Sequence, residues 1–237
     1  MRVKEPVITI DGASGSGKGV VSQQVAHRLG WKLLDSGALY RVLALAAQKH
    51  GVQIDNEEAL SLLAQHLDVQ FLANHYLFSR IQLEGEEVTD VIRMEQVGSD
   101  ASKLAVYPAV RLALLSRQRA FREAPGLIAD GRDMGTVVFP DANLKIFLLA
   151  DPEVRARRRY EQLKEKGINV NLTDLIEELR ERDRRDQERL ISPLKPAEDS
   201  VCIDTNCLTV MQVVDCVLLE AKRVLPLISI LCGEGGN

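Results

Sequence analysis

The stretch GASGSGKGV, residues 12–20, constrains the fold of this chain more than any other part of the sequence. It follows a short, β-rich apolar run, PVITIDG, and precedes KGVVSQQVAHRLG, in which apolar residues recur at helical spacing. A glycine-rich turn between a buried strand and a helix exposes consecutive backbone N–H groups, which can bind a phosphate together with the helix N-terminus. The sequence therefore predicts a phosphate-binding loop at residues 12–20.

The loop matches the pattern G-x-x-x-x-G-K-[ST] except at its last position, where Gly19 replaces a hydroxyl residue. The GTPase elements D-x-x-G and N-K-x-D do not occur in the sequence, and a motor-type ATPase would keep a hydroxyl directly after Lys18. The form G-K-G followed by Thr is typical of nucleoside monophosphate kinases, so Gly19 indicates that class. Val20 departs from it, because Thr is usual there. The predicted ATP-binding residues of the loop are Gly12, Ala13, Ser14, Gly15, Ser16, Gly17, Lys18, Gly19 and Val20.

The rest of the chain alternates between strand-like and helix-like segments. WKLLD leads into a helical segment, ALYRVLALAAQKHG, and later GLIADG, NLKIFLLAD and SVCIDTN resemble buried strands. A last helix is expected at about residues 209–224. This alternation predicts an α/β fold with a central parallel sheet, whose ligands bind beyond the carboxyl ends of the strands. Acidic residues near such ends are Asp11, Asp35, Asp130, Asp133, Asp151 and Asp204.

Two regions interrupt this core. LDVQFL, YLFSRIQLEGEEV and VIRMEQ indicate short strands, and predict a small antiparallel insert at residues 64–100 between core segments 1–63 and 101–237. Two arginine-rich helical segments, DPEVRARRRYEQLKEKG and TDLIEELRERDRRDQERL, are consistent with a short lid at about residues 151–190. Thr173 or Asp174 is the expected cap of the second of these helices.

Composition excludes several classes of protein. The 237 residues carry a net charge of −4, which gives no global attraction to nucleic acid or to a membrane. The four cysteines have no zinc-site spacing, and no apolar run is long enough to span a bilayer. We therefore expect a cytoplasmic protein that binds neither nucleic acid nor membrane.

Four motifs together resemble those of the bacterial cytidylate kinases: LLDSGALYR (33–41), RQRAF (117–121), LIADGRDMGTVVFPDANLKIFL (127–148) and ERDRRDQER (181–189). The resemblance covers nearly all of residues 5–222. It implies a three-layer P-loop kinase fold with an enlarged insert that binds the nucleoside monophosphate, and a short helical lid. It also implies a monomeric enzyme of pyrimidine nucleotide metabolism that uses Mg²⁺ and ATP to phosphorylate CMP and dCMP to CDP and dCDP.

The chemistry of such a transfer agrees with the arginine content. The acceptor phosphate has a second pKa of about 6, so it is already an anion near pH 7 and needs no general base. Catalysis is then positioning and charge neutralisation, for which the planar guanidinium of arginine is well suited. The residues predicted to be catalytic are Lys18, Arg132, Arg182 and Arg189.

The resemblance also implies the roles of individual residues. Arg41 and Arg132 would hold the acceptor phosphate, Arg182 and Asp186 the ribose, and Arg189 the phosphates. Ser102, Arg111 and Asp133 would recognise the cytosine edge, which offers an N4 donor beside O2 and N3 acceptors. Two further residues are expected at the site, with Ser36 binding the acceptor and Arg158 binding ATP from the lid. Mg²⁺ would arrive with ATP and be held through water near Asp35 or Asp130, although each could equally be a strand-end cap.

Other functions stay open at this point. The chain could phosphorylate another small acceptor, such as UMP, AMP or shikimate. It could be a nucleotide-binding protein that transfers no phosphate. A nucleic-acid-binding module built on the arginine helices is disfavoured by the negative net charge and by the lack of interleaved aromatic residues.

Overall fold

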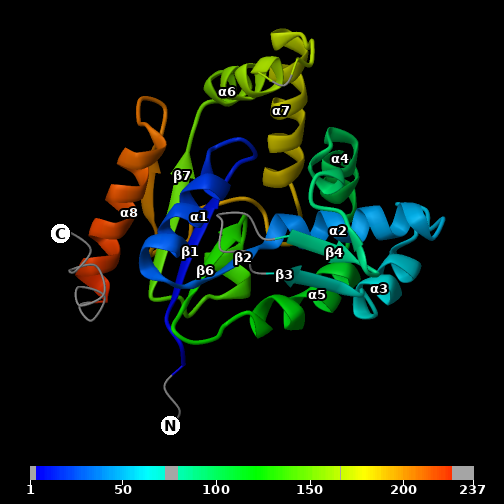
Figure 1. Ribbon diagram of the computed structural model, residues 1–237, viewed down its shortest axis with the longest axis horizontal. Helices are drawn as coiled ribbons and strands as arrows, with labels where there is room; N and C mark the ends of the chain where they lie inside the picture. The colour runs from blue at the N-terminus through cyan, green and yellow to red at the C-terminus, as the bar shows by residue number, and fades with distance from the viewer. Residues whose placement is uncertain (1–3, 73–79, 166, 226–237) are drawn as a thin grey trace. The chain divides into compact units, whose positions relative to one another are not determined.

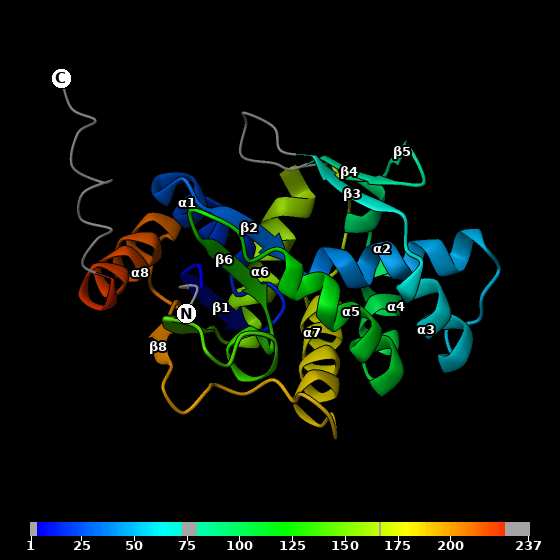
Figure 2. The ribbon, with the colours of Figure 1, turned by 90° about the horizontal axis from the view of Figure 1, so that it is seen from below.

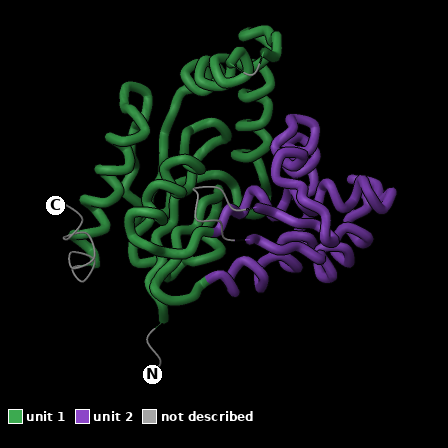
Figure 3. Tube along the Cα trace, viewed as in Figure 1, with its two compact units in different colours: residues 1–33, 122–237 green, residues 34–121 purple. Residues whose placement is uncertain are grey.

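The computed structural model describes residues 4–72, 80–165 and 167–225 of the chain. The chain divides into two compact units, shown in different colours in Figure 3. The first unit comprises Met1–Leu33 and Arg122–Asn237, and the second comprises Leu34–Phe121. The predicted insert, residues 64–100, lies within the second unit.

The first unit is built on a five-stranded sheet with the strand order β2-β6-β1-β7-β8. These strands are β1 (Val7–Gly12), β2 (Lys32–Asp35), β6 (Leu127–Gly131), β7 (Leu144–Leu149) and β8 (Val201–Asp204). The central strand β1 runs parallel to β6 and β7, and β7 runs parallel to β8. The predicted parallel α/β sheet is confirmed, and the chain reverses its direction of winding at β1. The carboxyl end of β1 is therefore the place where such sheets bind ligands.

Two helices cover one face of this sheet. Apolar residues of α1 (Lys18–Leu29) and α8 (Val210–Val224) form one buried cluster with Ile8 and Ile10 of β1. Figures 1 and 2 show α1 and α8 side by side. Because side chains alternate along a strand, Thr9 and Asp11 point to the opposite face. There the short π-helix η2 (Met134–Val138) contacts β1 and β6.

The two arginine-rich helices follow β7. They are α6 (Pro152–Glu165) and α7 (Leu172–Gln187), and they pack on each other through a small apolar cluster that includes Leu163 and Leu175. The expected cap of α7 was wrong, since Asn171 is the N-cap and its side chain accepts a hydrogen bond from the Thr173 N–H at 2.9 Å. Asparagine at this position satisfies one of the free N–H groups of the first turn.

The second unit is helical around a small sheet. Its helices are α2 (Ser36–Lys49), α3 (Glu57–Gln65), α4 (Glu95–Leu104) and α5 (Pro108–Ala120), with a 3₁₀ turn η1 (Val91–Arg93). Its strands β3 (Val69–Leu72), β4 (Arg80–Leu83) and β5 (Glu86–Glu87) pair in antiparallel fashion, as predicted, with Ile81 and Leu83 buried. Part of the predicted strand YLFSRIQLEGEEV, residues 76–79, lies outside the described residues.

One expectation for this unit was wrong, and one helix was not predicted. VIRMEQ forms no strand; it forms η1 and the first turn of α4. The carbonyls of Ile92 and Met94 accept hydrogen bonds from Arg41 Nη1, at 2.8 and 3.3 Å, and not from a neighbouring strand. Helix α3 was not predicted, although Asn56 caps its first turn and Glu57 lies in that turn.

Candidate active site

The phosphate-binding loop joins β1 to α1 in the first unit. Gly12 has no room for a side chain, because a Cβ there would lie 2.7 Å from the Leu148 carbonyl oxygen. Gly15 and Gly17 have φ values of 78° and 89°, in the left-handed region that favours glycine. Gly17 is also the N-cap of α1 and offers no side chain to cap the helix, so the first-turn N–H groups face the loop. This backbone geometry suits a bound phosphate.

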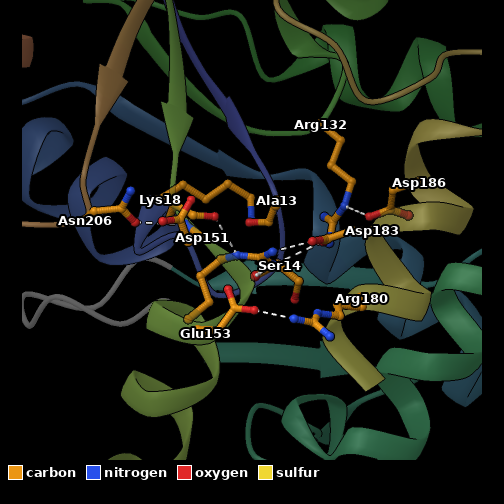
Figure 4. Close-up of polar contacts among 12 residues, drawn as sticks. Ala13, Ser14, Lys18, Arg132, Asp151, Glu153, Arg180, Asp183, Asp186 and Asn206 are labelled. Atoms are coloured by element: carbon orange, nitrogen blue, oxygen red, sulfur yellow. Dashed lines mark hydrogen bonds and ion pairs between the residues drawn. The ribbon is translucent and has the colours of Figure 1, made fainter. Parts of the chain in front are cut away.

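Lys18 is the first residue of α1 and its side chain folds back across the loop. Its Nζ donates a hydrogen bond to the Ala13 carbonyl at 3.1 Å (Figure 4). The ammonium group therefore lies at the loop itself, where it adds a positive charge to the N-terminal end of the helix.

Gly19 lies beside the carboxylate of Asp130, a buried residue on β6. A Cβ on Gly19 would lie 3.3 Å from Asp130 Oδ2, so the hydroxyl residue of other phosphate-binding loops would crowd this oxygen. A carboxylate next to a phosphate-binding loop suits Mg²⁺, which keeps several waters and prefers oxygen ligands. Asp35 instead caps α2, since its side chain accepts a hydrogen bond from the Ala38 N–H at 2.9 Å.

A cleft of about 800 Å³ opens beside the loop in the same unit. Its walls come from the loop, α6, the segment after β8 and the start of α8, and include Gly15, Gly17, Val20, Arg158, Asn206 and Val210. Arg158 donates to the Thr205 hydroxyl at 3.4 Å and to the Thr205 carbonyl, which fixes its guanidinium at the cleft wall. Val20 is 47% exposed and adds an apolar surface where Thr was expected.

Arg155 supports the loop from α6, and the sequence analysis did not include it among the site residues. It is 1% exposed, donates to the Ser14 carbonyl at 2.8 Å and to the Ala150 carbonyl at 2.9 Å, and forms an ion pair with Asp183 of α7. Its guanidinium thus joins the loop, α6 and α7. In the sequence, Arg155 is one of several adjacent arginines, and nothing in that pattern distinguishes a buried arginine from a solvated one.

Asp186 of α7 is completely buried and pairs with two arginines that are far from each other in the sequence. Arg132, which follows β6, binds one carboxylate oxygen, and Arg189 binds the other; Figure 4 shows the pair with Arg132. Burial alone would raise the pKa of Asp186, but the charges of Arg132 and Arg189 hold it below its usual value. We call these three residues the Asp186 cluster.

Arg132 in turn keeps its positive charge. Burial alone would lower its pKa, but the Asp186 carboxylate raises it above the usual value. Arg182 also lies close enough for its charge to lower the pKa of Asp186. The first unit therefore brings together four of the predicted site residues: Arg132, Arg182, Asp186 and Arg189.

Asp11 and Asp133 are two further buried acids of the first unit. Asp11 Oδ1 and Oδ2 accept hydrogen bonds from the N–H groups of Met134 and Gly135, at 2.9 and 2.8 Å. Burial raises the pKa of Asp11 to about 7, while these two backbone hydrogen bonds oppose the increase. Asp133 lies directly before η2, and its carbonyl accepts the N–H groups of Val137 and Val138 at 2.9 and 3.2 Å.

The second unit contains the other predicted acceptor-binding residues. Arg111 is buried, donates to the Ala105 carbonyl at 3.1 Å and lies over the ring of Tyr40, with 5.9 Å from its Cζ to the ring centroid. The Ser36 hydroxyl donates to Gln118 Oε1 at 2.7 Å. The Ser102 hydroxyl is buried and has no hydrogen-bond partner among the described residues.

The guanidinium of Arg41 packs closely against its neighbours. Its guanidinium lies against Gly98 of α4, where an added Cβ would come within 2.6 Å of Nη2. Arg41 is thus held by two carbonyls and by the backbone of α4.

The described part of the chain contains neither a direct metal-binding cluster nor a membrane-spanning helix. Among the described residues, no cluster of three or more His, Cys, Asp and Glu side chains could hold a metal ion directly. None of the described helices is both long and apolar enough to cross a membrane.

Comparison with known proteins identifies the family of this chain. A protein-family model described as cytidylate kinase matches residues 8–223. A cytidylate kinase from Pseudomonas paraeruginosa is 63% identical over 224 residues, which cover 94% of this chain and 98% of the relative. A cytidylate kinase from Stutzerimonas stutzeri is 62% identical and the match covers 91% of this chain and 94% of the relative.

A solved structure supports the fold alone. An uncharacterised protein from Eubacterium ventriosum superposes with a TM-score of 0.51 at 14% identity, covering 93% of this chain and 99% of that protein.

Proposed function

The chain belongs to the cytidylate kinase family, and we propose that it transfers the γ-phosphoryl group of ATP to CMP and dCMP, giving CDP and dCDP. The observation that carries this proposal is the Asp186 cluster, which holds Arg132 and Arg189 in the unit that also contains the phosphate-binding loop. An anion-binding loop together with preorganised arginines is what a transfer between two phosphates requires.

The donor would bind in the cleft of the first unit. The β- and γ-phosphates would lie on the N–H groups of the phosphate-binding loop, with Lys18 reaching the outer phosphates after releasing the Ala13 carbonyl. The nucleoside would occupy the cleft beside Arg158 and Val20, both of which line it. Residues 151–190 would act as the lid that excludes water from the transfer.

The residues proposed to bind the acceptor are those that the sequence predicts within each unit. Arg41, Arg132 and Arg189 would hold its phosphate, and Arg182 with Asp186 its ribose. Ser36, Ser102, Arg111 and Asp133 would bind the nucleoside. Asp133 would accept a hydrogen bond from the N4 amine of cytosine, whereas uracil places an acceptor at that position. The buried hydroxyl of Ser102, which has no hydrogen-bond partner among the described residues, supports this assignment, because buried polar groups require partners.

Catalysis would then require no general base. The acceptor phosphate is an anion near neutral pH, and the barrier comes chiefly from bringing two polyanions together. Fixed positive charges lower this barrier without reorganising during the reaction. The raised pKa of Arg132 ensures that it contributes a full charge at every physiological pH.

Mg²⁺ would accompany ATP, and Asp130 would hold it through water beside the phosphate-binding loop. When bound, the ion neutralises phosphate charge in the transition state. Asp35 is less suited to this role, because its carboxylate already caps α2. We further propose that the enzyme is a monomer and acts in the cytoplasm, in pyrimidine nucleotide metabolism.

A coupled assay of ADP release across CMP, dCMP, UMP, AMP and shikimate tests the proposal. We expect kcat/KM for CMP and dCMP to exceed the others by at least ~10-fold, since the O4 carbonyl of uracil, for example, cannot donate the hydrogen bond that the N4 amine of cytosine would donate to Asp133. Equal kcat/KM for UMP and CMP would contradict the cytosine assignment. Tight ATP binding without formation of CDP would instead favour a nucleotide-binding protein that transfers no phosphate.

A further inference from the structure

Asp11 occupies an unusual position for a carboxylate. It is the residue of β1 directly before Gly12, where the phosphate-binding loop begins, and it is only 5% exposed. Its side chain lies on the face of the sheet opposite Ile8 and Ile10. The proposed reaction assigns it no contact with ATP or with the acceptor.

The two oxygens of Asp11 hold a specific piece of backbone. They accept the N–H groups of Met134 and Gly135, the first two residues of η2. In strand register, Asp11 lies opposite Gly131, the last residue of β6. Two residues, Arg132 and Asp133, therefore connect Gly131, which the sheet fixes, to Met134, whose N–H binds the Asp11 carboxylate.

The packing around this segment leaves little freedom. A Cβ on Gly131 would lie 2.7 Å from Met134 Cγ, and a Cβ on Gly135 would lie 2.9 Å from Thr9 Oγ1. The glycines of the motif DGRDMGT thus allow η2 to sit against β1 at the distance that the Asp11 hydrogen bonds need. The two glycines of the motif therefore have a packing role, although no contact with a ligand is proposed for them.

The chemistry of the side chain fits this role. Above its pKa of about 7, the Asp11 carboxylate is ionised and presents two acceptors and no donor, whereas Asn presents one acceptor and one amide donor. Asn at position 11 would therefore direct N–H groups toward one of the two backbone N–H donors. The charges that act on Asp11 are those of Asp133 and Lys18, while Lys145 of β7 lies against Gly135.

We infer that Asp11 is a positioning residue, which acts through the backbone of Met134 and Gly135 to hold Arg132 and Asp133 in the conformation that binds the acceptor. Because Asp11 is also adjacent to Gly12, one buried carboxylate fixes the acceptor segment relative to the start of the phosphate-binding loop. This inference rests on the roles proposed above for Arg132 and Asp133.

The substitution Asp11→Asn tests it, with Asp141→Asn as the matched control. Asp141 is a half-exposed acid in the same unit whose partners are Lys4 and Arg122, so its loss leaves the segment untouched. We expect Asp11→Asn to raise KM for CMP by about tenfold or more, since one hydrogen bond to the backbone is lost and the other loses its charge assistance. The dissociation constant for ADP, measured by calorimetry, should change by less than about twofold in both variants.

Hydrogen–deuterium exchange gives a readout that does not depend on activity. In Asp11→Asn, the amides of residues 132–138 should exchange faster than in the wild type and in Asp141→Asn, while those of residues 12–20 keep their wild-type rates. If Asp11→Asn does not fold, Gly135→Ala keeps the inference testable. The added methyl group would displace residues 132–138 from β1 while Asp11 stays intact. This variant should raise KM for CMP without changing the affinity for ADP.

These experiments distinguish a failure of the inference from a failure of the proposed function. A wild-type protein that does not phosphorylate CMP overturns the proposed function, whereas the exchange pattern still reports on Asp11. Unchanged exchange at residues 132–138 in Asp11→Asn overturns the inference. So does a lower kcat with unchanged KM for CMP, or an equal rise in KM for CMP and for ATP, because either would mean that Asp11 acts only on the fold or on the phosphate-binding loop.

Discussion

The phosphate-binding loop and the Asp186 cluster are both proposed to bind phosphate, but they are constructed differently. The loop is nine consecutive residues whose backbone supplies the binding groups, with glycines at 12, 15 and 17 making the conformation possible. The Asp186 cluster joins side chains from the end of β6 and from α7 and its C-terminal end, and depends on one buried carboxylate. Apart from its charged Lys18, a backbone site should tolerate changes of side chain, and a buried ion cluster should not.

Removal of Lys18 should have the largest effect, because it is the only side chain of the loop that carries a charge. We expect Lys18→Ala to lower kcat/KM for ATP by at least ~10³-fold, since a fixed charge at the transferring phosphates is lost. The exposed Lys222 of α8 provides the control, and steady-state kinetics should show no change for Lys222→Ala. A fall of less than tenfold in Lys18→Ala would mean that the backbone alone performs the work of the loop.

Loss of the central carboxylate should damage the Asp186 cluster through stability. Asp186→Ala leaves Arg132 and Arg189 as largely buried charges without their carboxylate, and should cost about 3–5 kcal/mol in the free energy of unfolding. Urea titration of the wild type and the variant measures this. The matched control is Glu181→Ala, which removes an exposed carboxylate from the same helix and should shift the midpoint very little. Equal stability of Asp186→Ala and wild type would contradict the buried-pair description.

Arg132→Ala separates binding from stability in the same cluster. It should lower kcat/KM for CMP by at least ~10²-fold, because it removes the charge-assisted contact that we propose with the acceptor phosphate. Arg184 lies on the exposed side of α7, where it pairs with Glu181 and Glu188, and Arg184→Ala should keep wild-type kinetics. If the two variants have the same kcat/KM, Arg132 has only a structural role.

Asp11 lies between the two regions and predicts a dependence of stability on pH. Its native pKa of about 7 exceeds the unfolded value of 3.8, so between these values the native state binds a proton that the unfolded state lacks. Its contribution to stability is therefore largest at low pH and falls as the pH rises to 7, by roughly 2 kcal/mol between pH 5 and pH 7. Comparing the free energies of unfolding of the wild type and Asp11→Asn at pH 5, 6, 7 and 8 measures the pH-dependent contribution of Asp11. A difference that does not vary with pH would contradict the raised pKa.

Val20→Thr should produce the smallest effect. It introduces the hydroxyl that the sequence pattern led us to expect, while the β-branched shape and the backbone N–H stay the same. One neutral hydrogen bond contributes ~1 kcal/mol, so kcat/KM for ATP should rise by no more than roughly fivefold. If the Val20 protein is inactive and Val20→Thr restores activity by several orders of magnitude, the tolerance assigned to the backbone site is wrong.

Local features of the sequence determined the outline of this protein. The run PVITIDG, the glycines of the loop and the helical spacing after Lys18 predicted β1, the loop and α1, and the structure confirms that these elements and the parallel sheet exist. Strand and helix periodicity depends on neighbours a few residues apart, so a single sequence contains it. The same holds for Gly30, whose φ of 65° ends α1 as expected.

Tertiary structure decided the features that depend on distant partners. VIRMEQ has the composition of a strand, but Arg41 binds its carbonyls and η1 forms instead. The sequence does not distinguish Arg155, which is buried against Ser14 and Asp183, from the solvated arginines beside it. The roles assigned to the site residues stay predictions, but the partners of Asp186 and Asp11 came only from the structure. A buried charge is stable only where the fold supplies its counter-charge or its hydrogen bonds, and these partners lie more than 50 residues away in the chain for Arg132 and Asp186, and more than 100 for Asp11 and Met134.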